Sequence, residues 1–317
     1  MPTAPALAER LVLAPEVETA LRERRPVVAL ESTLISHGLP HPANLEVARR
    51  SEAAVRDAGA LPATIAIHDG RLLVGLTDAD LEALATAPPG TVRKAARPSL
   101  AAALAADGWA ATTVSATMIA AHAAGIRVFA TGGIGGVHRG ALVGTGTAGP
   151  TFDISSDLEE LARIPMAVVC AGPKSILDVA ATIEHLETRG VPVVAIGQSD
   201  VPGFYARSSG VRAPLSVADV DAAAGLARIH LDLGLGTAIL LTVPVPATDA
   251  LSPEVAGEAI ERAIGEASLR SVEGPALTPW LLGRIAELTA GASVAANIAL
   301  IVNDARVAGE LAVRLAD

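Results

Sequence analysis

The feature that most constrains the fold is a series of short, almost wholly apolar runs, each followed by glycine or polar residues and then by a helical pattern. The clearest runs are residues 27–30, 127–130, 193–196 and 238–243. Strands without polar residues are buried on both faces, and strands that alternate with helices form a mostly parallel sheet with helices on both sides. The sequence therefore predicts an α/β fold. Because we find neither a linker nor an internal repeat, we expect the 317 residues to form a single domain.

Other elements follow from periodicity and from breaking residues. Residues 63–67 and 72–74 are expected to form a hairpin around Asp69-Gly70. Residues 35–42, which contain two histidines and two prolines, are expected to form a loop. Helices are predicted over residues 5–24, 44–57 with Asn44 as the cap, 77–87, 217–232, 252–268, 278–289 and 293–315.

One apolar run leads directly into candidate chemistry. Residues 168–171 are followed by Gly172-Pro173-Lys174, and proline suits the first position of a helix. Lys174 is therefore predicted in the first helical turn, where the helix dipole disfavours a positive charge. A neutral lysine amine is a nucleophile that forms Schiff bases with sugar carbonyls.

The choice of basic residues supports a special role for lysine. Of the 24 lysine and arginine residues, only Lys94 and Lys174 are lysines. Arginine serves solubility and ion pairing, but it stays protonated and cannot form an imine. We therefore predict Lys174 as a nucleophile. For Lys94 the composition leaves a functional and an incidental role equally open.

Two further candidates follow buried strands. Glu31 comes directly after residues 27–30, and ligands of open α/β sheets bind beyond the carboxyl ends of the strands. A glutamate in such a crevice is a candidate general acid. After residues 127–130 come Thr131 and the glycine loop, residues 132–136. This loop is either a tight turn or a phosphate cradle of backbone N–H groups, and the following His138-Arg139 favours a phosphate or ribose role.

Polar residues near two predicted helices are candidate ligands. Asp153 and Asp157 lie on either side of a helix start, at which Ser156 and Glu159 match a capping box. Carboxylates with water suit Mg²⁺ or Mn²⁺, although Asp157 can instead compensate the helix dipole. Asn297 is a polar residue within the apolar helical stretch 294–300, so it either braces the fold or reaches a ligand.

Composition argues against several functional classes. The net charge of −10 and the lack of a basic stripe argue against a nucleic-acid partner. A single cysteine excludes an internal disulfide and a cysteine-based zinc site. The opening residues do not match a signal peptide, and no apolar run reaches membrane-span length without a break. We therefore expect a cytoplasmic protein that binds no membrane.

Taken together, these segments resemble the indigoidine synthase A family, to which the pseudouridine-5'-phosphate glycosidases belong. The matching pieces span nearly the whole chain in family order. They are residues 29–33, 35–40, 111–114, 131–138, 151–158, 172–178, 244–246, 277–279 and 296–300.

The resemblance implies a three-layer α/β/α fold, a homotrimer and a divalent metal, typically Mn²⁺. It also implies reversible cleavage of the C–C glycosidic bond of pseudouridine 5'-phosphate to uracil and ribose 5-phosphate. By motif position Lys174 matches the Schiff-base nucleophile, Glu31 the proton donor and Asp153 the metal ligand. The implied substrate contacts are Lys94, Val114, Thr131, His138, Ser155, Ser156, Asp157 and Asn297.

The sequence also departs from the family pattern. After Lys94 it reads Ala96-Arg97-Pro98-Ser99, where the family usually has Ser-Arg-Arg-Asp, and residues 140–150 form a longer loop without acidic residues. These differences border the expected site, so substrate choice can differ. The alternatives are an aldolase that uses the same lysine imine on sugar phosphates, a relative acting on a different base, and a nucleotide-binding regulator without catalysis.

Overall fold

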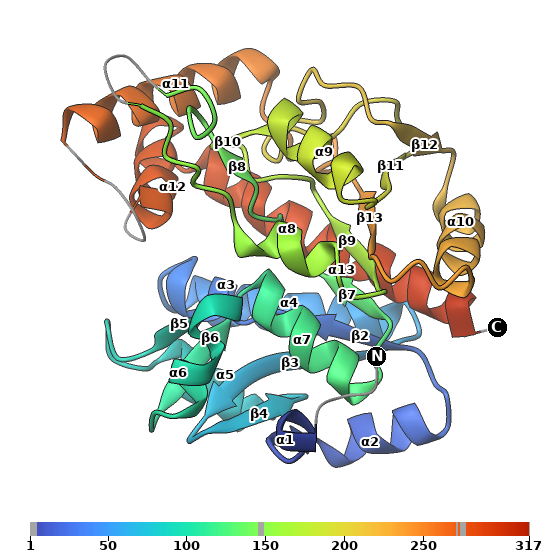
Figure 1. Ribbon diagram of the computed structural model, residues 1–317. Helices are drawn as coiled ribbons and strands as arrows, with labels where there is room; N and C mark the ends of the chain where they lie inside the picture. Colours follow the sequence, from blue (N-terminus) through green and yellow to red (C-terminus); the bar gives the residue numbers. More distant parts are fainter. Residues whose placement is uncertain (1–4, 145–148, 271, 273–276, 317) are drawn as a thin grey trace.

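The computed structural model describes residues 5–144, 149–270, 272 and 277–316 (Figure 1). Its strands are β1 Leu11–Leu13, β2 Val27–Leu30, β3 Leu61–His68, β4 Arg71–Val74, β5 Arg93–Ala95, β6 Trp109–Thr112, β7 Val128–Ala130, β8 Val137–His138, β9 Ala167–Cys170, β10 Leu177–Asp178, β11 Val193–Ile196, β12 Leu215–Val217 and β13 Ile239–Thr242. Its helices are α1 Pro5–Ala8, α2 Pro15–Arg22, α3 Thr33–His37, α4 Ala43–Asp57, α5 Asp78–Ala85, the 3₁₀ turn η1 Arg97–Ser99, α6 Leu100–Leu104, α7 Val114–Ala124, α8 Ser156–Leu161, α9 Val179–Thr188, α10 Val220–Asp232, α11 Pro253–Leu269, α12 Leu277–Leu288 and α13 Ala292–Ala316.

One large sheet runs through the molecule. Its strands follow the order β1-β4-β3-β2-β7-β9-β13-β11-β12, while β6 pairs with β3 and β5 pairs with β6. Every pair from β3 through β2 to β12 is parallel, whereas β3 is antiparallel to both β4 and β6. The central strands β2, β7, β9, β13 and β11 are buried along their whole length. The predicted mostly parallel sheet is therefore confirmed.

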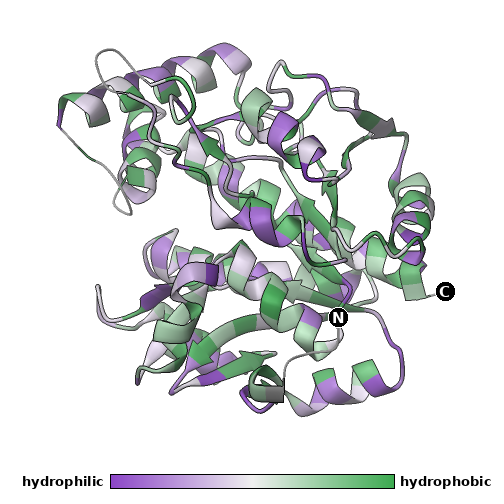
Figure 2. Ribbon diagram, viewed as in Figure 1, coloured by the Kyte–Doolittle hydropathy of each residue, from purple (hydrophilic) through white to green (hydrophobic). Residues whose placement is uncertain are grey.

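Helices cover both faces of this sheet. Val27 and Ala29 of β2 pack into a cluster that includes residues of α2, α7, α8 and α9. Val28 and Leu30 face the opposite way, into a cluster with α4, α10 and α13. Successive side chains of a strand point to opposite faces, so an apolar strand contributes to both clusters. Figure 2 shows the apolar colouring of the central strands, and the predicted three-layer α/β/α arrangement is confirmed.

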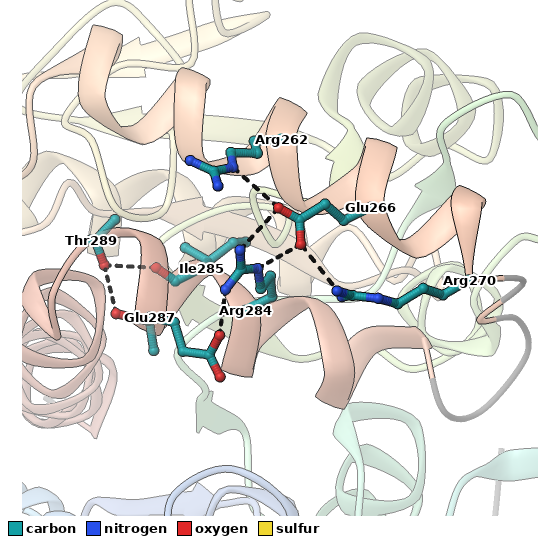
Figure 3. A network of polar contacts seen from close by, with 8 residues as sticks. Arg262, Glu266, Arg270, Arg284, Ile285, Glu287 and Thr289 are labelled. Carbon is teal, nitrogen blue, oxygen red and sulfur yellow. Dashed lines mark hydrogen bonds and ion pairs between the residues drawn. The ribbon is translucent and has the colours of Figure 1, made fainter.

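Helices α11 and α12 pack together over the loops that follow the sheet. Glu266 of α11 accepts two hydrogen bonds from Arg284 of α12, at 2.7 and 2.9 Å, and also contacts Arg262 and Arg270 (Figure 3). These bonds, those from Arg284 above all, lower the pKa of Glu266 to about 2, so the carboxylate stays charged near neutral pH.

Among the described residues no single helix is long and apolar enough to cross a membrane. Only α12 and α13 taken together reach that length and composition, and they bend by 118° at their break.

Three local predictions were wrong. Residues 5–24 form α1, β1 and α2 instead of one helix, because β1 pairs in parallel with β4 and Pro15 starts α2. Residues 35–42 are not all loop, since α3 extends to His37. The predicted helix at 217 begins at Val220, because Asp219 caps it and the preceding residues form β12.

The predicted role of Asn44 as a helix cap was also wrong. Pro42 occupies the cap position of α4, and Asn44 is buried inside the first turn. Its amide nitrogen donates to the carbonyl oxygens of Ile35 at 2.6 Å and Ala85 at 3.0 Å. Asn44 therefore ties the ends of α3 and α5 to the start of α4.

Asp304 is a buried acid in the middle of α13. Its side chain has no exposed surface, and neither carboxylate oxygen has a hydrogen-bond partner among the described residues. Burial raises the pKa of Asp304 well above its usual value, because a charged carboxylate is poorly solvated there. The folded protein therefore keeps a proton that the unfolded chain releases near pH 4.

This difference predicts a pH-dependent cost in stability. As the pH rises above about 4, the unfolded state binds fewer protons than the folded state, so Asp304 lowers the free energy of unfolding by about 1.4 kcal/mol per pH unit, up to its folded pKa. Asp304→Asn removes this effect, and we expect its stability advantage over wild type, measured by urea unfolding, to grow as the pH rises above about 4 until the folded pKa of Asp304 is reached. The exposed Asp57→Asn should show no such growth. Parallel stability curves for Asp304→Asn and wild type would contradict the prediction.

Candidate active site

Two cavities lie side by side beyond the carboxyl ends of the central strands, with volumes of about 350 and 80 Å³. Glu31, Lys94 and Lys174 line both cavities. The larger one is also lined by Val114, His138, Asp153, Ser155, Ser156 and Asp157, and the smaller one by Asn297. A further cavity of about 260 Å³ lies at the opposite end of β2 and β7 and contains none of the predicted site residues. The predicted residues are thus brought together at one end of the sheet.

The position of Lys174 differs from the prediction. Residues 171–176 form a loop, and α9 begins at Val179, where Asp178 caps it by accepting the N–H of Ala181 at 3.0 Å. The predicted helix start at Pro173 was therefore wrong, and no helix dipole acts on Lys174 in the way the sequence suggested.

Backbone pairing with the glycine loop sets the position of Lys174 instead. The Lys174 N–H donates to the Ile134 carbonyl at 3.1 Å, and the Ile134 N–H donates to the Gly172 carbonyl at 3.2 Å. Gly172 has a φ of +85°, which few residues other than glycine adopt. The loops that follow β7 and β9 therefore hold each other at the edge of the cavity.

The glycine loop, residues 132–136, is packed against side chains from several elements. A Cβ at Gly132 would lie 2.6 Å from Ile301 of α13, and one at Gly133 would lie 2.6 Å from the Phe204 ring. A Cβ at Gly135 would overlap Ser155 and lie 2.8 Å from an Asp157 oxygen. Close packing thus explains these three glycines, while the phosphate role of the loop stays a prediction.

Glu31 is held by two hydroxyl groups. It follows β2 and is only 7% exposed. One carboxylate oxygen accepts a hydrogen bond from Thr33 at the start of α3, and the other accepts one from Thr131 at the end of β7. Thr131 does not line either large cavity and reaches the site only through Glu31. The two bonds fix the carboxyl group where the cavities meet.

Lys94 brings a second amine to the same cavities. It lies on β5, which pairs in parallel with β6. Residue Lys94 is exposed overall, but desolvation of its amine by surrounding atoms and the nearby Lys174 lower the pKa of Lys94, whereas Glu31 and Asp157 act in the opposite direction. Two amines that share a cavity repel each other unless an anion lies between them, so the geometry suits a negatively charged ligand.

Asp157 joins three segments around the larger cavity. One of its oxygens accepts the backbone N–H of Ser115 in α7 at 3.0 Å, and the other accepts that of Gly135 at 2.9 Å. The helix cap is Ser155, which accepts the Asp157 N–H, so the predicted capping box at Ser156 was one residue too late. Asp157 therefore positions the cavity wall, whatever contact it makes with a ligand.

Ser115 and Thr33 are site residues that the sequence reasoning missed. The Ser115 hydroxyl accepts the Arg97 N–H at 3.1 Å and lies 3.3 Å from the Ser156 hydroxyl. Arg97 also pairs with the buried Glu160 of α8, which ties the segment after Lys94 to the helix after Ser155. A serine in the first turn of a mostly apolar helix was the one available signal for Ser115.

The candidate metal ligand Asp153 lies beside His138. Its Oδ2 is 3.8 Å from His138 Nδ1, and its side chain is about half exposed. Both oxygens of Asp157 accept backbone N–H groups, and metal binding by Asp153 stays a prediction. Within the described part of the chain, no three His, Cys, Asp or Glu side chains are grouped as a metal site.

Comparisons with known proteins agree over nearly the full length. The family model described as "Indigoidine synthase A like protein" matches residues 16–314. A pseudouridine-5'-phosphate glycosidase of Paracoccus denitrificans is 51% identical over 306 residues, which cover 96% of this chain and 98% of that protein. One from Caldanaerobacter subterraneus is 51% identical over 303 residues and covers 96% of each chain.

Two solved structures share the fold. The prealnumycin C-glycosynthase AlnA, in complex with ribulose 5-phosphate, aligns with a TM-score of 0.87 at 39% identity, over 96% of this chain and 97% of that one. An indigoidine synthase A-like protein from Thermotoga maritima aligns with a TM-score of 0.84 at 32% identity, over 97% of each chain. The fold prediction is thus supported by structures as well as by the topology.

The tight packing at Gly135 predicts the effect of adding a single methyl group. Gly135→Ala forces Ser155 and Asp157 to move, so we expect a loss of about 1–3 kcal/mol in the free energy of unfolding by urea. Gly149→Ala is the matched control, because a Cβ at Gly149 would meet nothing within 4 Å. Equal stability of the two variants would show that the loop is not packed as described.

Proposed function

This chain belongs to the indigoidine synthase A-like family, and on that premise we propose that it is an enzyme of C-glycosidic bond cleavage. The proposed substrate is pseudouridine 5'-phosphate, and the products of the reversible reaction are uracil and ribose 5-phosphate. Two full-length relatives that are 51% identical carry the name of this activity. The observation that carries the proposal is that Lys174 and Glu31 line the same two cavities.

The chemistry of the bond favours an imine. A C–C glycosidic bond has no heteroatom leaving group to protonate, so hydrolysis by two carboxyl groups does not suit it. We propose that the ribose ring opens at the C1'–O4' bond, O4' gains a proton, and Lys174 Nζ bonds to C1'. The C1'–C5 bond then breaks, its electron pair passes into the uracil ring, and C5 takes a proton. The remaining C1'=N imine is hydrolysed by water, which frees Lys174 and ribose 5-phosphate.

The other residues have roles that fit their places. Glu31, held by Thr33 and Thr131 where the cavities meet, is the proposed proton donor to the sugar or the base. Lys94, His138 and the hydroxyls of Ser155 and Ser156 line the larger cavity and suit the phosphate end. Asn297 of α13 lines the smaller cavity and suits a ribose hydroxyl.

A lysine imine can be trapped by chemical reduction. With ribose 5-phosphate and borohydride, we expect the mass of a reduced pentose phosphate on Lys174, located by peptide mass spectrometry. Lys174→Arg should abolish both the adduct and uracil release, because a guanidinium forms no imine. Lys94→Met serves as the control, since it removes an amine of the same cavity but leaves the nucleophile. An adduct on another residue, or none with active enzyme, would refute the mechanism.

We further propose that Asp153 holds Mn²⁺. A hard cation of this kind binds through one or two carboxylates and keeps several waters, and Asp153 offers a half-exposed carboxylate at the cavity. The bound ion would supply positive charge that neutralises the substrate phosphate. Because no three His, Cys, Asp or Glu side chains of the described residues are grouped there, we expect weak binding that depends mainly on Asp153.

Metal binding can be measured without catalysis. A ligand that binds only the folded state raises its stability by about 2.7 kcal/mol at one hundred times its Kd. We therefore expect millimolar Mn²⁺ to raise the Tm of wild type and not that of Asp153→Asn. His138→Gln keeps the carboxylate and should retain most of the shift. An equal shift in wild type and Asp153→Asn would place the metal elsewhere.

One comparison favours a second candidate activity. AlnA is named as a C-glycosynthase, so a relative of this chain is described as forming the bond rather than cleaving it. Uracil release from pseudouridine 5'-phosphate, measured against consumption of ribose 5-phosphate with other aromatic acceptors, separates the two.

The homotrimer implied by the resemblance also stays a proposal. The exposed side chains of Val143 and Phe152 provide apolar surface that an assembly would cover.

A further inference from the structure

Glu31 also lines a third, much smaller cavity, which shares Leu34 and Ile301 with the 80 Å³ cavity. It has a volume of about 10 Å³ and lies between the ends of β2 and β7, the middle of β3, and helices α3, α4 and α13. Its polar wall consists of Glu31, Thr131, Ser51 and Thr64. A volume of this size with several polar neighbours suits one water molecule.

A hydrogen bond continues from this cavity toward the surface. Thr64 of β3 is 2% exposed and is paired in register with Leu30, directly before Glu31. Its hydroxyl donates to Glu52 Oε1 at 2.5 Å. Glu52 lies next to Ser51 on α4 and is only partly buried. The polar groups therefore form a line from Glu31 through the cavity and Thr64 to Glu52.

The charges around Glu52 suit a group that exchanges protons. Burial raises the pKa of Glu52, and the nearby carboxylates of Glu16 in α2 and Asp78 in α5 act in the same direction. The Thr64 hydrogen bond and Arg56 of α4 oppose this shift. Arg56 is itself paired with Glu16 at 3.0 Å on the exposed rim, so Glu52 lies close to solvent.

Glu31 needs such a route because substrate would fill the two larger cavities that it lines. The residue is only 7% exposed. Once substrate is bound, protons cannot pass freely between Glu31 and bulk water through those cavities.

We propose that Glu52 is the outer end of a proton route to Glu31, through Thr64 and one water molecule in the small cavity. This inference rests on the proposed function, because it assumes that Glu31 gives up a proton in each turnover.

The protons balance along this line. When the C1'–C5 bond breaks, Glu31 gives a proton to the product. The cavity water then gives a proton to Glu31. Glu52, protonated from solvent, donates to the Thr64 oxygen, so the Thr64 hydroxyl turns away from Glu52 and gives its own proton to the cavity water. Only O–H bonds form and break along the route, so no oxidant, reductant or further reactant is needed. In the synthetic direction each transfer runs in reverse.

Substitutions at Glu52 test the route at its outer end, at a residue that does not line the two substrate cavities. We expect Glu52→Gln to lower kcat about tenfold and to leave KM unchanged, because an amide cannot pass the proton on. The solvent deuterium isotope effect on kcat should rise, since proton delivery becomes rate-limiting. Glu46→Gln is the control, because Glu46 lies on the same helix and is exposed. It should match wild type in all three quantities.

Thr64 provides an independent pair of variants. Thr64→Ser keeps the hydroxyl and should keep kcat and the isotope effect, whereas Thr64→Val keeps the shape, loses the hydroxyl and should behave like Glu52→Gln. The equilibrium amount of borohydride-trapped Lys174 adduct and the Tm should stay close to wild type in the impaired variants. Loss of adduct or of folding together with kcat would show that these residues are only structural.

The outcomes separate this inference from the proposed function. If wild type releases uracil while Glu52→Gln and Thr64→Val both keep its kcat and isotope effect, the route is wrong and the enzyme assignment stands. If wild type releases no uracil from pseudouridine 5'-phosphate, the proposed function falls, and the route falls with it.

Discussion

The active site depends on the backbone pairing between the loops after β7 and β9. Ile134 exchanges hydrogen bonds with Gly172 and Lys174, so the glycine loop and the lysine loop have a fixed spacing. Because β7 and β9 are parallel neighbours, both loops leave the sheet at the same edge. Glu31 leaves β2, the next strand along, and is tied to β7 through Thr131. Three adjacent strands thus deliver the proposed nucleophile, the proposed acid and the loop that holds them.

Around this centre, side chains hold helix ends in place through backbone groups. Asp157 accepts the backbone N–H groups of Ser115 and Gly135. The Asn44 amide donates to the carbonyl oxygens of Ile35 in α3 and Ala85 in α5. Such bonds satisfy backbone groups that the helix leaves unpaired at its ends. Small residues allow these segments to approach closely, as at Gly309 of α13, where a Cβ would lie 2.7 Å from Ala58 Cβ. A chain with 2% aromatic residues therefore gains order from close backbone contact.

Sequence reasoning predicted the sheet well because the strands are defined by burial. An apolar run such as Val193–Ile196 is best accommodated as a buried strand, and all four of its residues are buried in the structure. It failed where distant partners decide. Pro173-Lys174 has the local pattern of a helix start, but pairing with Ile134 keeps it extended. Residues 5–24 repeat apolar side chains at helical spacing, yet pairing with β4 turns Leu11–Leu13 into a strand.

The site residues also divide into those that a local sequence pattern predicts and those that depend on distant contacts. Glu31 and Lys174 were predicted from local patterns, Glu31 from the buried strand before it and Lys174 from the apolar run, the Gly-Pro turn and the scarcity of lysine. Most other contacts came from the family resemblance, and the cavity then brought them together. Thr33 was missed although its partner Glu31 lies close to it in the sequence. Ser115 was missed because its role depends on distant partners, and its position in a helix turn gave only a weak signal. Hydrogen bonds between residues far apart in the chain cannot be read from spacing alone.

The sharing of one cavity by both lysines has a practical consequence. Apart from its amino terminus, the chain has no other primary amines, since every other basic side chain is arginine or histidine. Acylating reagents that attack amines would thus label the cavity and the first residue, and little else. After brief acylation, the intact mass of the protein would then show whether a bound ligand protects the two cavity lysines, without any engineered tag.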